Sequence, residues 1–343
     1  MGISDRLLDV SLSLAAADPE ISIVMATCSR AHLLPGVLDT LLNQSLLPDV
    51  PVEMVIVDDQ STDKTPQILA DYQANSAIPI RIFRGPKAGV ASARNLAAEH
   101  ARGRWMASFD DDELASQQWL ETLFRVAVQH DAVCVAGATE LSLPAGHSLS
   151  EVGRRTRRLL GEMLFTEERQ MGFGELPATN NVLIRSDVFR SLGGFDVRFT
   201  EGGEDTDLFQ RMWRAGHRMW LAPAARVQHL IPPRRLDPHV LTMNAMRTGT
   251  IEARLAGARG DKRGLLRNLA GRSVLAIARD VPQWLAGKLT RRPDVVLDAR
   301  LSLAVTAGLY RGIPAARGKS SQFLEKMDFR SRHGERSETA ERK

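Results

Sequence analysis

The sequence predicts an α/β fold with a mostly parallel central sheet flanked by helices, followed by a helical C-terminal extension. Three observations support this prediction. Apolar, β-rich runs alternate with helical patterns, as expected for parallel strands joined by right-handed crossovers. Polar clusters follow several of these runs directly, at the strand ends where such sheets bind ligands. Beyond residue 239 the pattern becomes largely helical and basic.

The expected strands are short apolar runs. The first, ISIVMAT at 21–27, is apolar throughout, which is typical of a strand covered on both faces. Further strands are expected at 52–59, 78–84, 104–109 and 132–137. Apolar residues at helical spacing predict the intervening helices at 31–44, 61–73, 89–103 and 117–130.

The pattern changes after residue 140. Residues 140–178 contain Pro, Gly and the basic run GRRTRRLL, which is consistent with a solvated loop or surface helix, or with a mobile segment that covers a substrate. A helix is expected from Glu204 until Gly216, followed by one or two strands within 218–230.

Charge divides the chain into two parts. Residues 1–239 contain 24 Lys and Arg against 31 Asp and Glu, whereas residues 240–343 contain 21 against 10. We therefore predict a domain at 20–239 after an N-terminal segment, 1–19, that contains a short helix. A basic amphipathic helical extension is expected at 240–330 and a disordered tail at 331–343. The extension suits an anionic membrane surface or a helical appendage packed on the core. No nucleic-acid recognition motif is present, so no nucleic-acid partner is expected.

Composition indicates a cytoplasmic protein. Cys28 and Cys134 lie in apolar stretches without metal-ligand spacing, so packed thiols in a reducing compartment are expected. No apolar run approaches the ~20 residues of a membrane span, and the N-terminus lacks the basic start of a signal peptide. The predicted location is the cytoplasm, with attachment to the inner face of the cytoplasmic membrane through 240–330.

An acidic cluster follows the strand at 104–109. Residues 107–114 read ASFDDDEL, and the adjacent carboxylates repel one another unless solvent or a cation offsets their charge. Alternate side chains at a strand exit point the same way, so Asp110 and Asp112 can face one Mg²⁺ or Mn²⁺ ion. A solvated acidic loop is the other interpretation.

Two further segments contain titratable side chains that suit catalysis. In GGEDTDL, at 202–208, Glu204 and Asp205 begin a helix. Either both are ordinary capping carboxylates, or the helix dipole keeps Asp205 ionised as a general base. His229, near the end of the last expected strand, is either a core histidine or a metal ligand.

Taken together, these segments resemble the family 2 glycosyltransferases, an inverting family with the Rossmann-like GT-A fold. The resemblance covers about residues 20–232, and the motifs occur in the family's order. They read ISIVMATCSRAHLLPGVLDTLLNQS, VEMVIVDDQSTDKT, GVASARNLA, GRWMASFDDDE, NNVLIRSDVFRSLGGFD, GGEDTDLFQRMWRAG and ARVQHL.

The resemblance implies catalytic and metal-binding roles. Asp110 and Asp112 match the DxD motif that holds Mg²⁺ or Mn²⁺ against the donor diphosphate. His229 matches a histidine that completes the metal shell in related enzymes. Asp205 matches the catalytic base, with Glu204 beside it.

It also implies a nucleotide-sugar site. Asp59 matches the carboxylate that pairs with uracil, so UDP is the favoured nucleotide. The residues implied to bind the nucleotide sugar are Thr27, Arg30, Asp59, Arg94, Asn95 and Asp111. The expected reaction is metal-dependent transfer to a hydroxyl of a glycan or lipid-linked acceptor, in the synthesis of a cell-envelope polysaccharide. The sugar, the linkage and the oligomeric state are not determined by the sequence.

The sequence departs from the family pattern at two positions. Gln60 stands where the family often has Gly, so this turn is expected to differ or to use a negative φ, and Ala97 replaces another Gly within a helix. Two other functions stay open, a catalytically inactive scaffold and a sugar-nucleotidyltransferase. The latter would need a glycine-rich loop after the first strand, which ATCSRAH does not provide.

Overall fold

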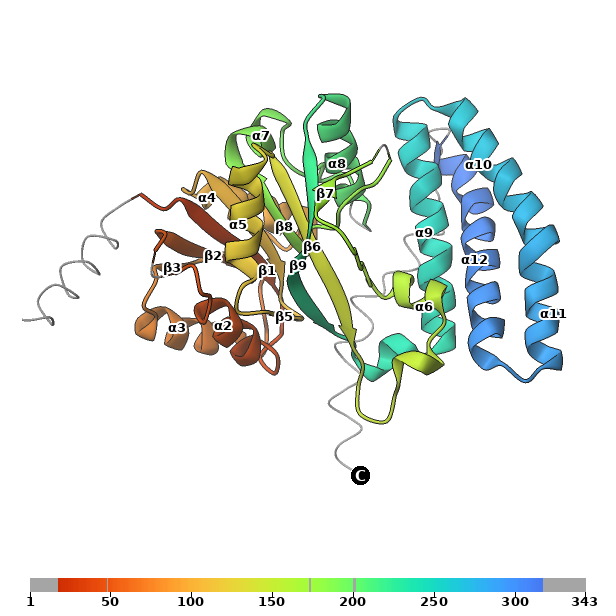
Figure 1. The fold of residues 1–343 in the computed structure, drawn as a ribbon, viewed down its shortest axis with the longest axis horizontal. Coiled ribbons are helices and arrows are strands. Elements are labelled where there is room, and N and C mark those ends of the chain that lie inside the picture. Colours follow the sequence, from red (N-terminus) through yellow and green to blue (C-terminus); the bar gives the residue numbers. More distant parts are fainter. Residues whose placement is uncertain (1–17, 48, 173, 200–201, 317–343) are drawn as a thin grey trace, which may run out of the picture. The chain divides into compact units, whose positions relative to one another are not determined.

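The computed structural model describes residues 18–316 except positions 48, 173, 200 and 201. The helix expected near the N-terminus and the tail expected at 331–343 lie outside the described residues. The described residues form two compact units that divide between residues 237 and 238 (Figure 1).

The N-terminal unit is built on a mixed sheet with the strand order β3-β2-β1-β4-β8-β6-β9-β5, and β7 pairs with β9. Strands β3, β2, β1 and β4 are parallel, whereas β8 runs antiparallel between β4 and β6. The strands are β1 (Ile21–Thr27), β2 (Val52–Asp58), β3 (Ile80–Arg84), β4 (Trp105–Asp110), β5 (Glu113–Ala115), β6 (Cys134–Ser142), β7 (Arg169–Gln170), β8 (Asn181–Arg185) and β9 (Met219–Leu230).

Both faces of this sheet are covered by helices, because the apolar side chains alternate between two cores. In β1, Ile23 and Met25 join one core, whereas Val24 joins the other. The first core includes side chains of α2 (Leu34–Leu42), α3 (Thr65–Asn75) and α5 (Trp119–Gln129). The second includes side chains of α4 (Val90–His100), α7 (Ser186–Ser191) and α8 (Glu204–Arg214).

The carboxyl ends of the parallel strands meet at one edge of the sheet. Thr27, the last residue of β1, is in register with Asp58 at the end of β2. Its neighbour Ala26 is in register with Asp110 at the end of β4. The polar clusters that follow these strands therefore lie at the same edge, as the sequence predicted.

The segment between β6 and β8 has little regular structure. It contains η1 (Leu149–Glu151), the short helix α6 (Arg154–Leu159) and the two-residue strand β7. A single-turn helix, η2 (Pro233–Leu236), follows β9 and ends the N-terminal unit.

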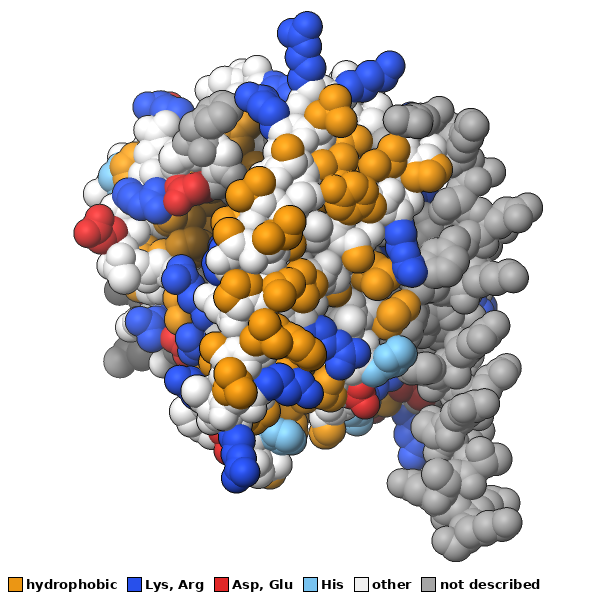
Figure 2. Space-filling view, turned by 90° about the vertical axis from the view of Figure 1, so that its right-hand side faces the viewer, with side chains coloured by type: hydrophobic (Ala, Val, Ile, Leu, Met, Phe, Trp, Pro, Cys, Tyr) orange, Lys and Arg blue, Asp and Glu red, His pale blue; other side chains and the backbone are white. Residues whose placement is uncertain are grey.

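The second unit consists of α9 (Pro238–Ala258), α10 (Lys262–Leu275), a π-helical turn η3 (Ala276–Asp280), α11 (Val281–Leu289) and α12 (Pro293–Ala316). Helices α9 and α12 pack at short range, because a Cβ atom at Gly249 or Gly308 would lie 2.0 Å from a backbone oxygen of the other helix. The surface of α10 and α11 leaves several large hydrophobic side chains exposed (Figure 2). Among the described helices, none is long and apolar enough to cross a membrane.

Two local expectations are corrected by the structure. Cys134 is buried as expected, but Cys28 is exposed. Gln60 has a φ of +63°, so it adopts the left-handed conformation that glycine favours instead of a negative φ. Its side chain donates to the carbonyl of Gly85, at 3.3 Å, which holds the turn against the end of β3.

Candidate active site

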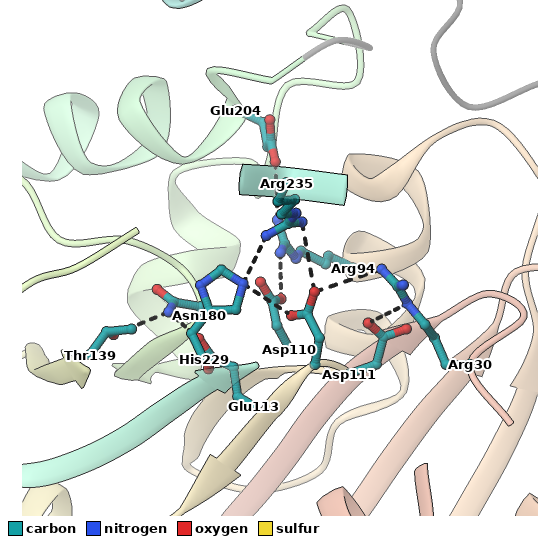
Figure 3. A network of polar contacts seen from close by, with 11 residues as sticks. Arg30, Arg94, Asp110, Asp111, Glu113, Thr139, Asn180, Glu204, His229 and Arg235 are labelled. Atoms are coloured by element: carbon teal, nitrogen blue, oxygen red, sulfur yellow. Dashed lines mark hydrogen bonds and ion pairs between the residues drawn. The ribbon is translucent and has the colours of Figure 1, made fainter. Parts of the chain in front are cut away.

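Side chains from α4, β4, β5, β6, α8, β9 and η2 and from the loops beside them meet near the carboxyl ends of β1 and β4 (Figure 3). Asp110 ends β4, and Asp111 and Asp112 follow it directly. The adjacent residue, Glu113, begins β5 and is paired in register with His229 of β9. The sheet therefore brings the acidic cluster and the predicted histidine together.

Arg94 of α4 links the acidic cluster to the beginning of α8. Its Nη2 atom lies 2.6 Å from an Asp110 carboxylate oxygen, and its Nη1 atom lies 3.0 Å from Glu204. The Arg94 side chain is only 13% exposed. Burial alone would lower its pKa, but the carboxylates of Asp110 and Glu204 raise it, so the guanidinium stays charged.

Arg30, in the loop after β1, contacts the second carboxylate of the cluster. Its Nε atom lies 3.2 Å from Asp111, and its Nη2 atom lies 3.7 Å from Asp112. Burial raises the pKa of Asp111 to about 6 in spite of the opposing charge of Arg30. Asp111 thus depends on this arginine to be ionised near neutral pH.

Asp112 lies between three side chains that favour its charged form. Burial would raise the pKa of Asp112, but His229, Arg235 and Arg30 together lower it to about 2. The Nε2 atom of His229 is 3.7 Å from Asp112 and 2.8 Å from Nη1 of Arg235. Arg235, in η2, also lies 3.7 Å from Asp112.

Glu113 lies below the cluster and is 1% exposed. It accepts a hydrogen bond from the side-chain amide of Asn180, which also donates to Thr139 at 3.2 Å. Burial and the charge of Asp110 raise the pKa of Glu113 well above its usual range. Glu113 supports the site through its contact with Asn180.

Glu204 and Asp205 begin α8 and differ in their surroundings. Glu204 is 5% exposed, and its pKa is raised by burial and by the charge of Asp205. Asp205 is partly exposed, and its carboxylate accepts a hydrogen bond from the backbone N–H of Thr206 at 2.6 Å. Asp205 lies close enough to Arg94 for its charge to raise the pKa of that guanidinium. The predicted base therefore stands at the same edge as the acidic cluster.

The loops after β1 and β2 are tied together beside the cluster. The backbone N–H of Asp59 donates to the carbonyl of Thr27 at 2.8 Å, and the Ser29 N–H donates to the Ser61 hydroxyl at 2.8 Å. The Asp59 carboxylate accepts from the backbone N–H of Lys87 at 2.6 Å. Thr27 and Asp59 are thus held at the expected strand ends.

Asn95 is hydrogen-bonded to the segment ahead of α8. Its side chain donates to the carbonyl of Phe195 at 2.8 Å and accepts from the Phe195 N–H at 2.9 Å. Both amide atoms are therefore used to fix the backbone ahead of α8. These bonds position that segment, and the contact of Asn95 with the nucleotide sugar stays a prediction.

The predicted metal-ligand set of Asp110, Asp112 and His229 is not assembled as a group of three. Within residues 18–316, apart from the four positions left out, no three or more His, Cys, Asp or Glu side chains are placed to hold a metal ion. The physical reason is the ion pair with Arg94, which engages the Asp110 carboxylate. Asp112 and His229 do fit as two ligands, because an oxygen and a nitrogen atom of suitable chemistry lie 3.7 Å apart.

Sequence reasoning missed Arg235 and Asn180. Arg235 lies six positions after His229 in a segment, IPPRRLDP, without a periodic pattern. Asn180 lies in the run ATNN, directly before β8. The polar pair at the start of a buried strand is a signal that could have indicated Asn180, whereas the contact of Arg235 depends on how the chain turns after β9.

Comparison with known proteins shows which family the N-terminal part of the chain is similar to. Residues 22–181 match the model of glycosyl transferase family 2. The chain is 27% identical to EpsE of Bacillus subtilis over 202 residues, which cover 58% of this chain and 69% of EpsE. It is 25% identical to the succinoglycan biosynthesis protein ExoM of Rhizobium meliloti over 209 residues, which cover 60% of this chain and 65% of ExoM. The chain thus spans about two thirds of the length of these relatives.

A solved structure supports the GT-A fold that the sequence predicted. The crystal structure of GalNAc-T7 with UDP, GalNAc and Mn²⁺ matches with a TM-score of 0.50 and 16% identity, over 71% of this chain and 51% of that chain. At this identity the likeness shows the fold alone, which is GT-A. The strand order, the residues at the strand ends and the match over residues 22–181 agree, so this part of the chain is similar to glycosyl transferase family 2, and the named relatives support a glycosyltransferase.

Proposed function

We propose that the chain transfers a sugar from a nucleoside diphosphate sugar, with UDP as the favoured nucleotide, to a hydroxyl of a glycan or lipid-linked acceptor. The observation that carries this proposal is the double ion pair of Arg94. It joins Asp110 at the end of β4 to Glu204 at the start of α8. The neighbouring Asp205 is thereby fixed beside the carboxylates that face the donor.

Asp205 is the general base in this proposal. It lies in the first turn of α8, where the helix dipole favours a negative charge. Its carboxylate accepts the proton of the acceptor hydroxyl as that oxygen bonds to the anomeric carbon. The bond from this carbon to the diphosphate oxygen breaks on the opposite side, so the configuration is inverted, and the nucleoside diphosphate leaves with the electron pair.

The donor diphosphate is proposed to lie near Arg30, Arg94 and Arg235, whose guanidinium groups suit phosphate oxygens. Asp59 and Thr27 would contact the nucleotide at the ends of β2 and β1. Asp112 and His229 would hold Mg²⁺ or Mn²⁺, with Asp110 joining them when it leaves Arg94. Such an ion neutralises the charge that develops on the departing diphosphate.

The proposed setting is the synthesis of a cell-envelope polysaccharide at the inner face of the cytoplasmic membrane. The relative ExoM is named a succinoglycan biosynthesis protein, which supports a glycan as the product. Lipid-linked acceptors lie at this membrane face, where cytoplasmic nucleotide sugars also reach the enzyme.

Donor use is tested by measuring the release of UDP from a panel of UDP-sugars, with and without Mn²⁺. Replacing Asp205 by Asn should lower the transfer rate by about 10²–10⁴-fold, because general base catalysis contributes this much. Binding of UDP, measured by calorimetry, should be unchanged. Asp131→Asn removes a carboxylate that is 87% exposed and serves as the matched control. A normal rate for Asp205→Asn would refute the assignment of the base.

A further inference from the structure

The second unit exposes a row of large aliphatic side chains on α10, η3 and α11. Their exposed fractions range from 43% to 86%, whereas such side chains are usually buried. We call this row the α10–α11 face (Figure 2). It consists of Leu266, Val274, Ile277, Val281, Leu285 and Leu289.

The row follows one side of a continuous helical segment. The ranges of α10, η3 and α11 adjoin from residue 262 to 289, and the exposed side chains recur at intervals of 3, 4 or 8 residues. In a regular α-helix each residue turns by about 100°, so Leu289 would lie about 140° from Leu266. The π-helical turn η3 adds about one residue to the helix, which brings Leu289 back to within about 40°. The row is therefore aligned by the irregularity in the helix.

Basic side chains flank this row. Lys262, Arg263 and Arg267 stand around Leu266, and Lys288 and Arg291 stand around Leu289. All five are exposed. None forms an ion pair with a residue that the structure describes, although Lys288 lies over the ring of Trp284 at 5.5 Å.

The acidic groups on or next to this segment are engaged in contacts of their own. Asp280 is 1% exposed, accepts from Ser302 at 2.6 Å and pairs with Arg279 at 2.8 Å. Asp261 caps α10 by accepting from the N–H of Gly264 at 2.8 Å. The five unpaired cations outnumber the carboxylate of Asp261, so the net charge around the α10–α11 face is positive.

We infer that the α10–α11 face docks onto a bilayer that contains anionic lipids, with its aliphatic row in the interfacial layer and its basic rim against the head groups. An aliphatic row with a basic rim is the pattern of helices that lie in a membrane interface. Trp284, 36% exposed beside Lys288, has the amphipathic ring typical of this layer. A second copy of the chain is a poorer partner, because two basic rims would face each other.

This inference narrows the membrane contact predicted for 240–330. The sequence predicted a basic amphipathic extension over all of 240–330, but its part ARLSLAVTAGLYRG, at 299–312, lies within α12. Its residues Leu301, Ala304 and Leu309 are at most 7% exposed, so they pack inside the helical unit. Among residues 238–316, the large aliphatic side chains that are exposed lie in the segment 265–289.

The test is co-sedimentation of the full chain with vesicles of phosphatidylcholine alone or mixed with phosphatidylglycerol. Binding should require phosphatidylglycerol and weaken as salt is raised. The double variant Ile277→Asp, Leu289→Asp should bind at least about tenfold more weakly, because two exposed aliphatic side chains lose their apolar contact. The double variant Arg267→Gln, Lys288→Gln should lose about fivefold for each cation.

Leu164→Asp is the matched control, because it replaces a leucine of the N-terminal unit that is 57% exposed. Its binding should equal that of the unmodified chain. The fluorescence of Trp284 gives a readout without changing the face: emission should shift to the blue with anionic vesicles, and Trp284→Phe should abolish the shift.

Three results would overturn the inference. The first is equal binding of the chain to both kinds of vesicle. The second is a loss of vesicle binding in Leu164→Asp as large as that in Ile277→Asp, Leu289→Asp. The third is a dimer in light scattering that Ile277→Asp, Leu289→Asp dissociates while its vesicle binding is unchanged. The measurements concern binding alone, so they do not depend on the proposed transfer reaction.

Discussion

Replacing Arg94 by Met is expected to destabilise the N-terminal unit by about 3–5 kcal/mol at neutral pH. The variant keeps much of the volume of the side chain but removes both ion pairs, with Asp110 and with Glu204. Removing one partner of a buried pair leaves the other charge without compensation, which costs more than the pair contributes.

The cost comes mainly from Glu204. Its side chain is 6% exposed, whereas that of Asp110 is 32% exposed and can be solvated. One oxygen of Glu204 already has no hydrogen-bond partner among the described residues, so water and neighbours offer little replacement. The double variant Arg94→Met, Glu204→Gln should therefore regain about 2 kcal/mol or more, because it no longer buries a charge.

The loss should depend on pH in a defined direction. The pKa of Glu204 is already raised above its ordinary value, mainly by burial, and the loss of Arg94 raises it further. A carboxyl with a raised folded-state pKa stabilises the fold below its unfolded pKa, about 4.3. This stabilisation is lost as the pH rises through the folded-state pKa. The difference between variant and wild type should thus be smaller near pH 4 than near pH 7.

Urea unfolding followed by circular dichroism at both pH values measures these effects. Arg185→Met is the matched control, because it removes an exposed pair with Asp187, whose side chain is 66% exposed. It should cost less than about 1 kcal/mol. A loss for Arg94→Met as small as that of the control, or one that is equal at both pH values, would refute the reasoning.

Three other variants test separate parts of the structure. Arg235→Ala should raise the affinity for Mn²⁺ in calorimetry by about tenfold, because it removes a positive charge beside the proposed metal ligands Asp112 and His229. Arg234→Ala, at an exposed position, is its control, and equal affinities of the two variants would contradict this prediction. Asn95→Ala should lower the free energy of unfolding by about 1–3 kcal/mol, since the Phe195 N–H and carbonyl lose their partners; an unchanged denaturant midpoint would show that water replaces them. Gly308→Leu should abolish packing of α12 on α9, because a Cβ atom there meets a carbonyl oxygen at 2.0 Å; a native thermal transition would show that the helices can separate without loss.

Much of the fold was predictable because burial leaves a local pattern. The runs at 21–27 and 104–109 are apolar on both faces, and the structure places them as β1 and β4 between two helical layers. The position of Asp110 followed from the end of such a run. The antiparallel strand β8 was harder to place, because strand direction depends on partners far along the chain.

The site was predictable where a residue acts through its position on a strand or helix end. Thr27, Asp112 and Glu204 stand where the pattern put them. The contacts of Arg94, Asn95 and Arg235 were not predictable, because a long or amide-bearing side chain selects its partners in three dimensions. Arg94 thus binds Asp110, and this pairing separates the predicted metal ligands.

Because of the arginines around the acidic strand end, folding of the site does not depend on binding of the donor. Arg30, Arg94 and Arg235 supply internal counterions to carboxylates that would otherwise push apart as the chain collapses. The polypeptide can therefore reach its native shape from its own charges, before any donor arrives. Under the proposed function, substrate binding would be an exchange of counterions, in which the same guanidinium groups pass from protein carboxylates to phosphate oxygens.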